Sequence, residues 1–150
     1  MTQEGVFAAL HSEGTIDDGL ILTHLVHVGD LQLPNEEIVH VVYLGQTIPG
    51  MLVPRGQNSV VLMNSNLSTI AQYRLKGETP RRCIDNRLYF DEPIELLEGF
   101  VECGGTASVW EVSYQSKLLC VTPLSTAADL LTLTPSESRR NFRAGLSESR

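Results

Sequence analysis

The residues best suited to chemistry are a group of arginines in the middle of the sequence. Arg81 and Arg82 are adjacent, and Arg87 follows shortly after them. A guanidinium donates two parallel hydrogen bonds to a carboxylate or a phosphate, so this group could hold an anionic ligand. The chain also has more acidic than basic residues, and those acids can pair with the same arginines. We favour such pairing within the protein over ligand capture.

Two histidines, His24 and His27, lie three residues apart. That spacing puts both imidazoles on one face of a helix but on opposite faces of a strand, and the surrounding apolar residues favour a strand. A turn at Pro34-Asn35 would place His40 opposite Gly29, far from His24. Since neither cysteines nor carboxylates cluster nearby, we predict no metal site and no cofactor.

The cysteines, Cys83, Cys103 and Cys120, are widely spaced and odd in number. This pattern favours free, buried thiols over a disulfide framework or a zinc ribbon. Cys103 precedes two glycines, but its neighbour Glu102 has the wrong charge to stabilise a thiolate. The glycines match neither a phosphate-binding loop nor a dinucleotide fingerprint. We therefore predict no catalytic residue from motifs alone.

Composition places the chain among ordinary globular proteins. It has 150 residues, of which 42% are hydrophobic and 19% are charged, and its net charge is −7. An acidic chain is a poor general binder of nucleic acid. No apolar run approaches the ~20 residues needed to cross a bilayer, and the first residues lack the pattern of a secretory signal. We expect a soluble, cytoplasmic protein with neither a nucleic-acid nor a membrane partner.

The strongest structural signal is the segment 106–124. Trp110, Val112 and Tyr114 alternate with smaller residues, which is the period of a strand with one buried face. A polar break at Gln115-Ser116, with a loop that could extend through Lys117, separates this strand from a second apolar run. The segment predicts a β-hairpin whose apolar face forms a wall of the core.

Further elements follow from the same patterns. We predict a short helix over residues 3–11, a bend or bulge at Gly29, and strands over 20–33, 38–44 and 59–63. The segment 67–75 is ambiguous, since Asn66 could cap a short helix there. The segment 81–90 predicts a strand in its second half, broken by Pro93, and 94–102 favours a strand over a helix.

These elements predict an α+β domain over residues 1–133. Its mostly antiparallel sheet would have about five to seven strands, open or partly closed into a barrel, with short helices at the N- and C-terminal ends. Residues 134–150 are predicted to form a C-terminal helix with a frayed tail, because Thr134, Pro135 and Glu137 make a capping box. The helix would place a basic and apolar surface against an acidic surface, either of the same chain or of a neighbouring subunit, through Arg139, Arg140, Phe142, Arg143 and Leu146.

Two functions remain open at this point. The leading hypothesis is a small non-enzymatic binding or regulatory module that acts through a protein partner or as a homodimer. The alternative is an enzyme or ligand-binding domain for a small anionic molecule, held by Arg81, Arg82 and Arg87, with His24 or His40 as the base. A cavity in which arginine and histidine converge would favour the alternative.

Overall fold

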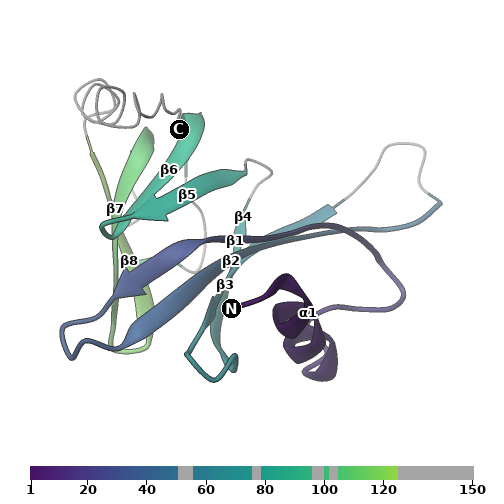
Figure 1. Ribbon diagram of the computed structural model, residues 1–150. Coiled ribbons are helices and arrows are strands. Elements are labelled where there is room, and N and C mark those ends of the chain that lie inside the picture. Colours follow the sequence, from purple (N-terminus) through teal and green to yellow (C-terminus); the bar gives the residue numbers. More distant parts are fainter. Residues whose placement is uncertain (51–55, 76–78, 96–99, 102–104, 125–150) are drawn as a thin grey trace.

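The computed structural model describes residues 1–50, 56–75, 79–95, 100–101 and 105–124. Within these ranges one helix accompanies an eight-stranded sheet whose strand order is β4-β3-β2-β1-β5-β6-β7-β8 (Figure 1). The elements are α1 (Gln3–Ser12), β1 (Ile21–Gln32), β2 (Ile38–Thr47), β3 (Gly56–Met63), β4 (Thr69–Leu75), β5 (Pro80–Ile84), β6 (Arg87–Ile94), β7 (Ala107–Gln115) and β8 (Leu118–Pro123).

The sheet is nearly closed, like a barrel. Every neighbouring pair of strands is antiparallel except β1 and β5, which are parallel. The two ends of the strand order meet where the backbone N–H of Leu119 on β8 donates a 2.8 Å hydrogen bond to the Tyr73 hydroxyl on β4. The predicted α+β class, the mostly antiparallel sheet and the N-terminal helix are thus confirmed. No described helix is long and apolar enough to cross a bilayer.

Two hydrophobic cores hold this sheet together. The inner core is enclosed by the curved sheet, and the outer core lies between α1 and the outer face of the first strands. Members of the inner core include Val28, Val41, Tyr43, Val60, Leu62, Tyr73, Leu88, Trp110, Val112, Leu119 and Val121. The outer core comprises Val6, Leu10, Ile16, Leu25, Val42, Leu44, Val61 and Met63. Successive residues of β2 therefore alternate between the two cores, as the period of a strand requires.

The predicted hairpin at 106–124 is confirmed as β7 and β8. Its loop is Ser116-Lys117, and both residues have positive φ angles, 51° and 67°. A two-residue loop with positive φ at both positions matches the twist of the flanking strands, although neither residue is the preferred asparagine or glycine. Trp110 is fully buried, and its indole N–H donates a 2.9 Å hydrogen bond to the Ala107 carbonyl.

The structure decides two segments that the sequence left partly undefined. Where a helix capped by Asn66 was one option, the chain forms β4, and the preceding turn is held by the Asn64 side chain, which accepts hydrogen bonds from the N–H groups of Asn66 and Ser68. The strand predicted for the second half of 81–90 is confirmed as β6, and the first half, for which no element was predicted, forms β5, so the segment is the hairpin β5–β6. It turns at Asp85-Asn86, whose φ angles are 52° and 60°. Asp and Asn tolerate this conformation well, so the turn chemistry was present in the sequence.

Pro93 does not end β6, which continues to Ile94. The ladder between β6 and β7 is interrupted between Tyr89 and Ile94. Since Pro93 lies in that interval, its missing N–H removes no pairing with β7. The predicted C-terminal helix and its proposed partner-binding residues, from Arg139 to Leu146, lie outside the described residues. The predicted strand at 94–102 is described only in part, and there Val101 forms an isolated bridge with Cys120.

Candidate functional site

A groove of about 960 Å³ lies between β1 and the β5–β6 hairpin. In Figure 1 this hairpin lies on one side of β1, and α1 lies on the other. The groove is lined by His24 and Val26 of β1, by Thr79 just before β5, by Pro80, Arg81 and Arg82 of β5, and by the residues of β6 from Tyr89 to Ile94. It combines both charge signs with aromatic and aliphatic surface, which is typical of a binding site.

For most of its length β1 pairs with another strand along one edge alone, and the groove lies along its other edge. β1 pairs with β2 from Ile21 to Gln32, whereas its pairing with β5 is limited to Gly29 and Cys83. Over the first half of β1, no other strand of the described chain lies on that edge. The Leu25 carbonyl accepts a 3.0 Å hydrogen bond from the Gln3 side chain and the Ile21 carbonyl accepts a 3.5 Å one from the Thr47 hydroxyl, so two backbone groups in this half have side-chain partners.

Three of the predicted ligand-binding residues line the groove. Arg81 is paired there, since its Nε lies 3.1 Å from Asp91 Oδ1 and both side chains are largely exposed. The Arg82 guanidinium lies over the Tyr89 ring, 5.7 Å from its centroid, which is the geometry of a cation–π contact. No carboxylate of the described ranges forms an ion pair with Arg82. His24 also faces the groove, and its ring lies 5.5 Å from that of Tyr43.

The other two predicted residues lie elsewhere. Arg87 begins β6 opposite Glu111 of β7 and is not part of the groove lining. His40 lies on the outer face of β2. The structure therefore brings together Arg81, Arg82 and His24, and it separates them from Arg87 and His40.

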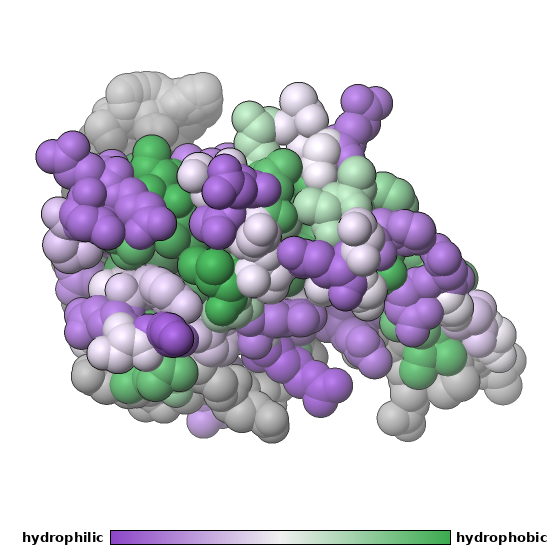
Figure 2. Space-filling model, turned by 90° about the horizontal axis from the view of Figure 1, so that it is seen from below, coloured by the Kyte–Doolittle hydropathy of each residue, from purple (hydrophilic) through white to green (hydrophobic). Residues whose placement is uncertain are grey.

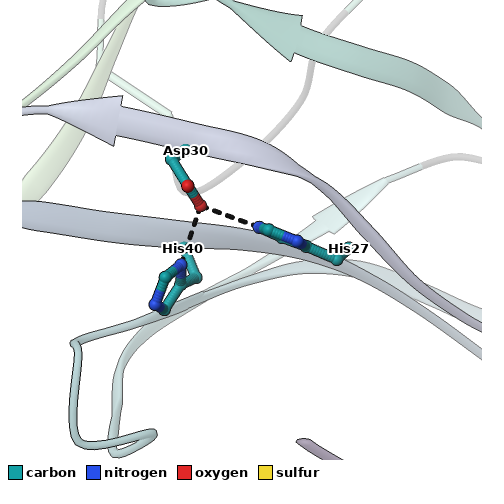
Figure 3. Close-up of side chains that lie close together, drawn as sticks. All are labelled: His27, Asp30 and His40. Carbon is teal, nitrogen blue, oxygen red and sulfur yellow. Dashed lines mark hydrogen bonds and ion pairs between the residues drawn. The ribbon is translucent and has the colours of Figure 1, made fainter. Parts of the chain in front are cut away.

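A second cluster, which the sequence analysis missed, joins His27, Asp30 and His40 (Figure 3). Asp30 Oδ1 lies 2.7 Å from His27 Nε2 and 2.7 Å from His40 Nδ1. The two imidazole rings meet edge to face, with centroids 5.4 Å apart. We call these residues the His-Asp-His cluster.

The cluster depends on two local features of the β1–β2 hairpin. The loop has three residues, 34–36, with Glu36 at a φ of 69°, and not the two expected at Pro34-Asn35. The longer loop moves the register by one residue, so His40 lies opposite Asp30 and not opposite Gly29 as predicted. The expectation that no carboxylate lies near these histidines was therefore wrong.

A bulge completes the arrangement. The register of β1 shifts between His27 and Gly29, as the predicted bulge at Gly29 implied. On a regular strand, residues three apart point to opposite faces, but one extra residue returns them to the same face. His27 and Asp30 consequently share the outer face. Glycine is needed at this point because a Cβ on Gly29 would lie 2.1 Å from the Cys83 carbonyl oxygen.

The electrostatics of the cluster follow from its hydrogen bonds. Partial burial by itself would raise the pKa of Asp30, but the hydrogen bonds and positive charge of His40 and His27 outweigh it and hold the pKa below its usual value. Asp30 is therefore ionised near neutral pH. It presents a carboxylate between two imidazoles at the surface.

Cys83 is a buried thiol, and burial raises its pKa to about 12, with a smaller contribution from the Asp30 charge. At neutral pH it should carry on the order of 10³-fold less thiolate than an ordinary cysteine. We expect Cys83 to resist iodoacetamide in the folded protein while the more exposed Cys120 reacts. Mass spectrometry of the digested protein measures both sites. Equal labelling of the two would contradict the buried position of Cys83.

The same thiol should affect stability at alkaline pH. Its pKa is higher in the folded than in the unfolded protein, so the neutral thiol favours folding. This contribution is present below the pKa of the unfolded thiol and is lost as the pH rises towards about 12.

Comparison of the chain with protein families, curated proteins and solved structures finds no match. The functional argument therefore starts from the groove and from the His-Asp-His cluster.

Proposed function

We propose that the protein is a non-enzymatic binding module that holds an extended segment of a protein partner along the edge of β1. The observation that carries this proposal is the open first half of β1 beside a large groove. A strand edge without a neighbour presents backbone donors and acceptors that can pair with another chain. Main-chain hydrogen bonds would supply affinity, and the groove would select side chains.

Exposed apolar side chains on the same half of β1 support this proposal. Ile21, Leu22 and Val26 are exposed to 53%, 37% and 42%, although each is a residue type that a complete sheet normally buries. A long, apolar, open edge is a liability in a protein without a partner for it. An added strand would cover these side chains and complete the ladder.

The lining of the groove indicates the chemistry of the partner segment. Val26, which is 42% exposed, offers an apolar contact, whereas Phe90 and Ile94 line the groove as nearly buried core residues. Arg82 offers a guanidinium that no described carboxylate engages. Asp91 is already used by Arg81. The matching segment would be extended, alternate apolar with polar side chains, and carry a carboxylate that reaches Arg82.

Figure 2 shows the molecule from below, the side of β1 on which α1 lies in Figure 1. The coloured apolar groups on this side are separated by hydrophilic ones, whereas large permanent interfaces are more uniformly apolar. The coloured part of this side therefore does not resemble a broad permanent interface, which leaves the open edge of β1 as the stronger candidate for partner binding.

A small anionic ligand is the second candidate, because His24 and Arg82 line the same groove. Arg87, which the sequence analysis added to this site, lies outside it. The backbone edge of β1 has no role in binding a small anion, so the two candidates differ in what they require from β1.

The test uses peptides selected from a random display library on the tag-free protein. We expect the selected peptides to alternate apolar residues with Asp or Glu, and Arg82→Gln should weaken their binding by about tenfold, the loss of one charge-assisted contact. Arg74→Gln is the matched control, since Arg74 is an exposed arginine on β4, away from the groove.

Other outcomes would reject the proposal. Peptides that bind Arg82→Gln as tightly as the wild type would exclude the groove. Binding of inorganic phosphate or citrate that depends on His24 and Arg82, without selected peptides, would favour the small-ligand candidate. A doubled mass in solution that falls when Val26 is changed to Lys would show that a second copy of the chain occupies the edge.

A further inference from the structure

We propose that His27, Asp30 and His40 form a binding site for one divalent transition-metal ion, for which zinc is the best fit. The cluster lies on the outer face of the sheet, whereas the groove is lined by His24, whose ring contacts Tyr43 of the inner core, and by the residues of β5 and β6; none of the three cluster residues lines the groove. The two proposals therefore rest on different residues, and either can fail without the other.

The set of donor atoms points to this class of ion. Two imidazole nitrogens and one carboxylate oxygen suit zinc and neighbouring first-row metals, while calcium and magnesium prefer oxygen alone. One donor atom from each residue lies within 4.8 Å of the other two. Three protein ligands would leave a position for water or for a further ligand, as in zinc sites that do not serve structure alone.

The geometry needs little adjustment to accept an ion. Zinc bonds of about 2.0–2.1 Å place tetrahedral ligand atoms roughly 3.3 Å apart. Asp30 Oδ1 now lies 2.7 Å from each histidine nitrogen, so the three side chains would open slightly around the ion. All three residues come from the paired strands β1 and β2, whose ladder is regular from His24 to His27 and from Gly29 to Gln32, so the backbone holds them in place.

The contacts in the metal-free cluster use the same atoms that a metal would. His27 Nε2 and His40 Nδ1 both point to Asp30 (Figure 3). For each nitrogen to offer its lone pair, the proton it shares with Asp30 must move to the other ring nitrogen or to solvent. The carboxylate then balances part of the charge of the ion.

Access to the cluster is open. The side chains of His27, His40 and Asp30 are 38%, 16% and 42% exposed. A hollow of about 240 Å³ adjoins His27 and is lined mainly by Val6, Leu25, Val26, Val42 and the first residues of the chain. A fourth ligand could therefore reach the ion from solvent or from this hollow.

A hydrogen-bonded surface network is the competing explanation. An exposed His–Asp pair contributes little to stability and needs no metal. The chain contains such a pair in His11 and Asp18, which lie 2.9 Å apart and have no second histidine beside them. This pair provides the matched control, because it shares the chemistry of the cluster except for the third ligand.

The experiment is a calorimetric titration of the tag-free full chain with zinc chloride. We expect one ion per chain. His27→Gln, His40→Gln and Asp30→Asn should each lower the affinity by at least ~100-fold, since changes in residues that merely support a metal ligand already cost up to that factor. His11→Gln and His24→Gln should leave the affinity unchanged.

Cobalt(II) gives an independent readout. The wild-type chain should develop visible absorption bands on cobalt addition, and zinc should abolish them. The bands should be absent in the three ligand variants. Urea unfolding of each variant without metal tests whether the variant is folded. We expect each to fold, because the cluster is partly exposed and its side chains contribute little to the core.

The proposal is overturned if the wild-type chain shows no one-to-one binding. It is also overturned if the three ligand variants keep the wild-type affinity, or if His11→Gln lowers it as much as they do. The last result would show that zinc does not distinguish the cluster from an ordinary His–Asp pair.

Discussion

Replacing Trp110 with alanine is expected to lower the free energy of unfolding by about 3–5 kcal/mol, the range for deleting a large buried aromatic side chain. Trp110 is fully buried in the inner core, and its N–H is bonded to the Ala107 carbonyl. The alanine variant would leave a cavity that the surrounding strands can fill only in part. Urea unfolding monitored by circular dichroism measures the change.

Leu118→Ala is the control for Trp110→Ala. Leu118 is also apolar and belongs to the same hairpin, but it is 47% exposed. Its replacement should change stability by less than about 0.5 kcal/mol. An unchanged unfolding midpoint for Trp110→Ala would contradict the placement of this residue and would move it out of the core.

Replacing Gly29 with alanine is expected to destabilise the protein by about 3 kcal/mol, at the upper end for overpacking. The added Cβ would lie 2.1 Å from the Cys83 carbonyl oxygen and 2.9 Å from the carbonyl carbon. These are backbone atoms, so no side-chain rotation relieves the contact. Because Gly29 and Cys83 form the β1–β5 pairing, the substitution should separate the two halves of the sheet there.

Two measurements test this expectation. The first is the unfolding midpoint of Gly29→Ala in urea, with Gly19→Ala as control, because a Cβ on Gly19 meets only the end of the Asp17 side chain. The second is the labelling of Cys83 with iodoacetamide, which should increase when the junction opens. If Gly29→Ala unfolds at the wild-type midpoint and protects Cys83 equally, β1 and β5 do not meet at this residue.

Much of the local structure was readable from the sequence. The alternation around Trp110 predicted the β7–β8 hairpin, and the β-branched runs predicted β1, β2 and β3. These elements depend on the period of their own side chains, which a sequence displays directly. The opposite orientations of His24 and His27 were predicted on the same basis. The structure places His24 against Tyr43 of the inner core and His27 in the outer-face cluster.

The errors arose where a few residues of turn chemistry decide the register. One extra loop residue, Glu36, places His40 opposite Asp30, and a bulge before Gly29 turns His27 to the same face. Gly29 was recognised as a bend, so part of the signal was available. The meeting of His27, Asp30 and His40 requires the correct pairing register of β1 with β2, and a shift of one residue would separate them. Because β2 is apolar on both faces, its hydrophobic pattern does not specify that register.

The sequence by itself determined the α+β fold class, most of the strands and the burial of Trp110. Each of these follows from local periodicity and from the need to bury apolar side chains. Tertiary structure alone decided the parallel contact of β1 with β5, the groove beside it and the closure of β4 onto β8. Those features join residues that are far apart in the chain, and they depend on backbone contacts such as that between Gly29 and Cys83. Backbone contacts of this kind leave no periodic trace in the sequence.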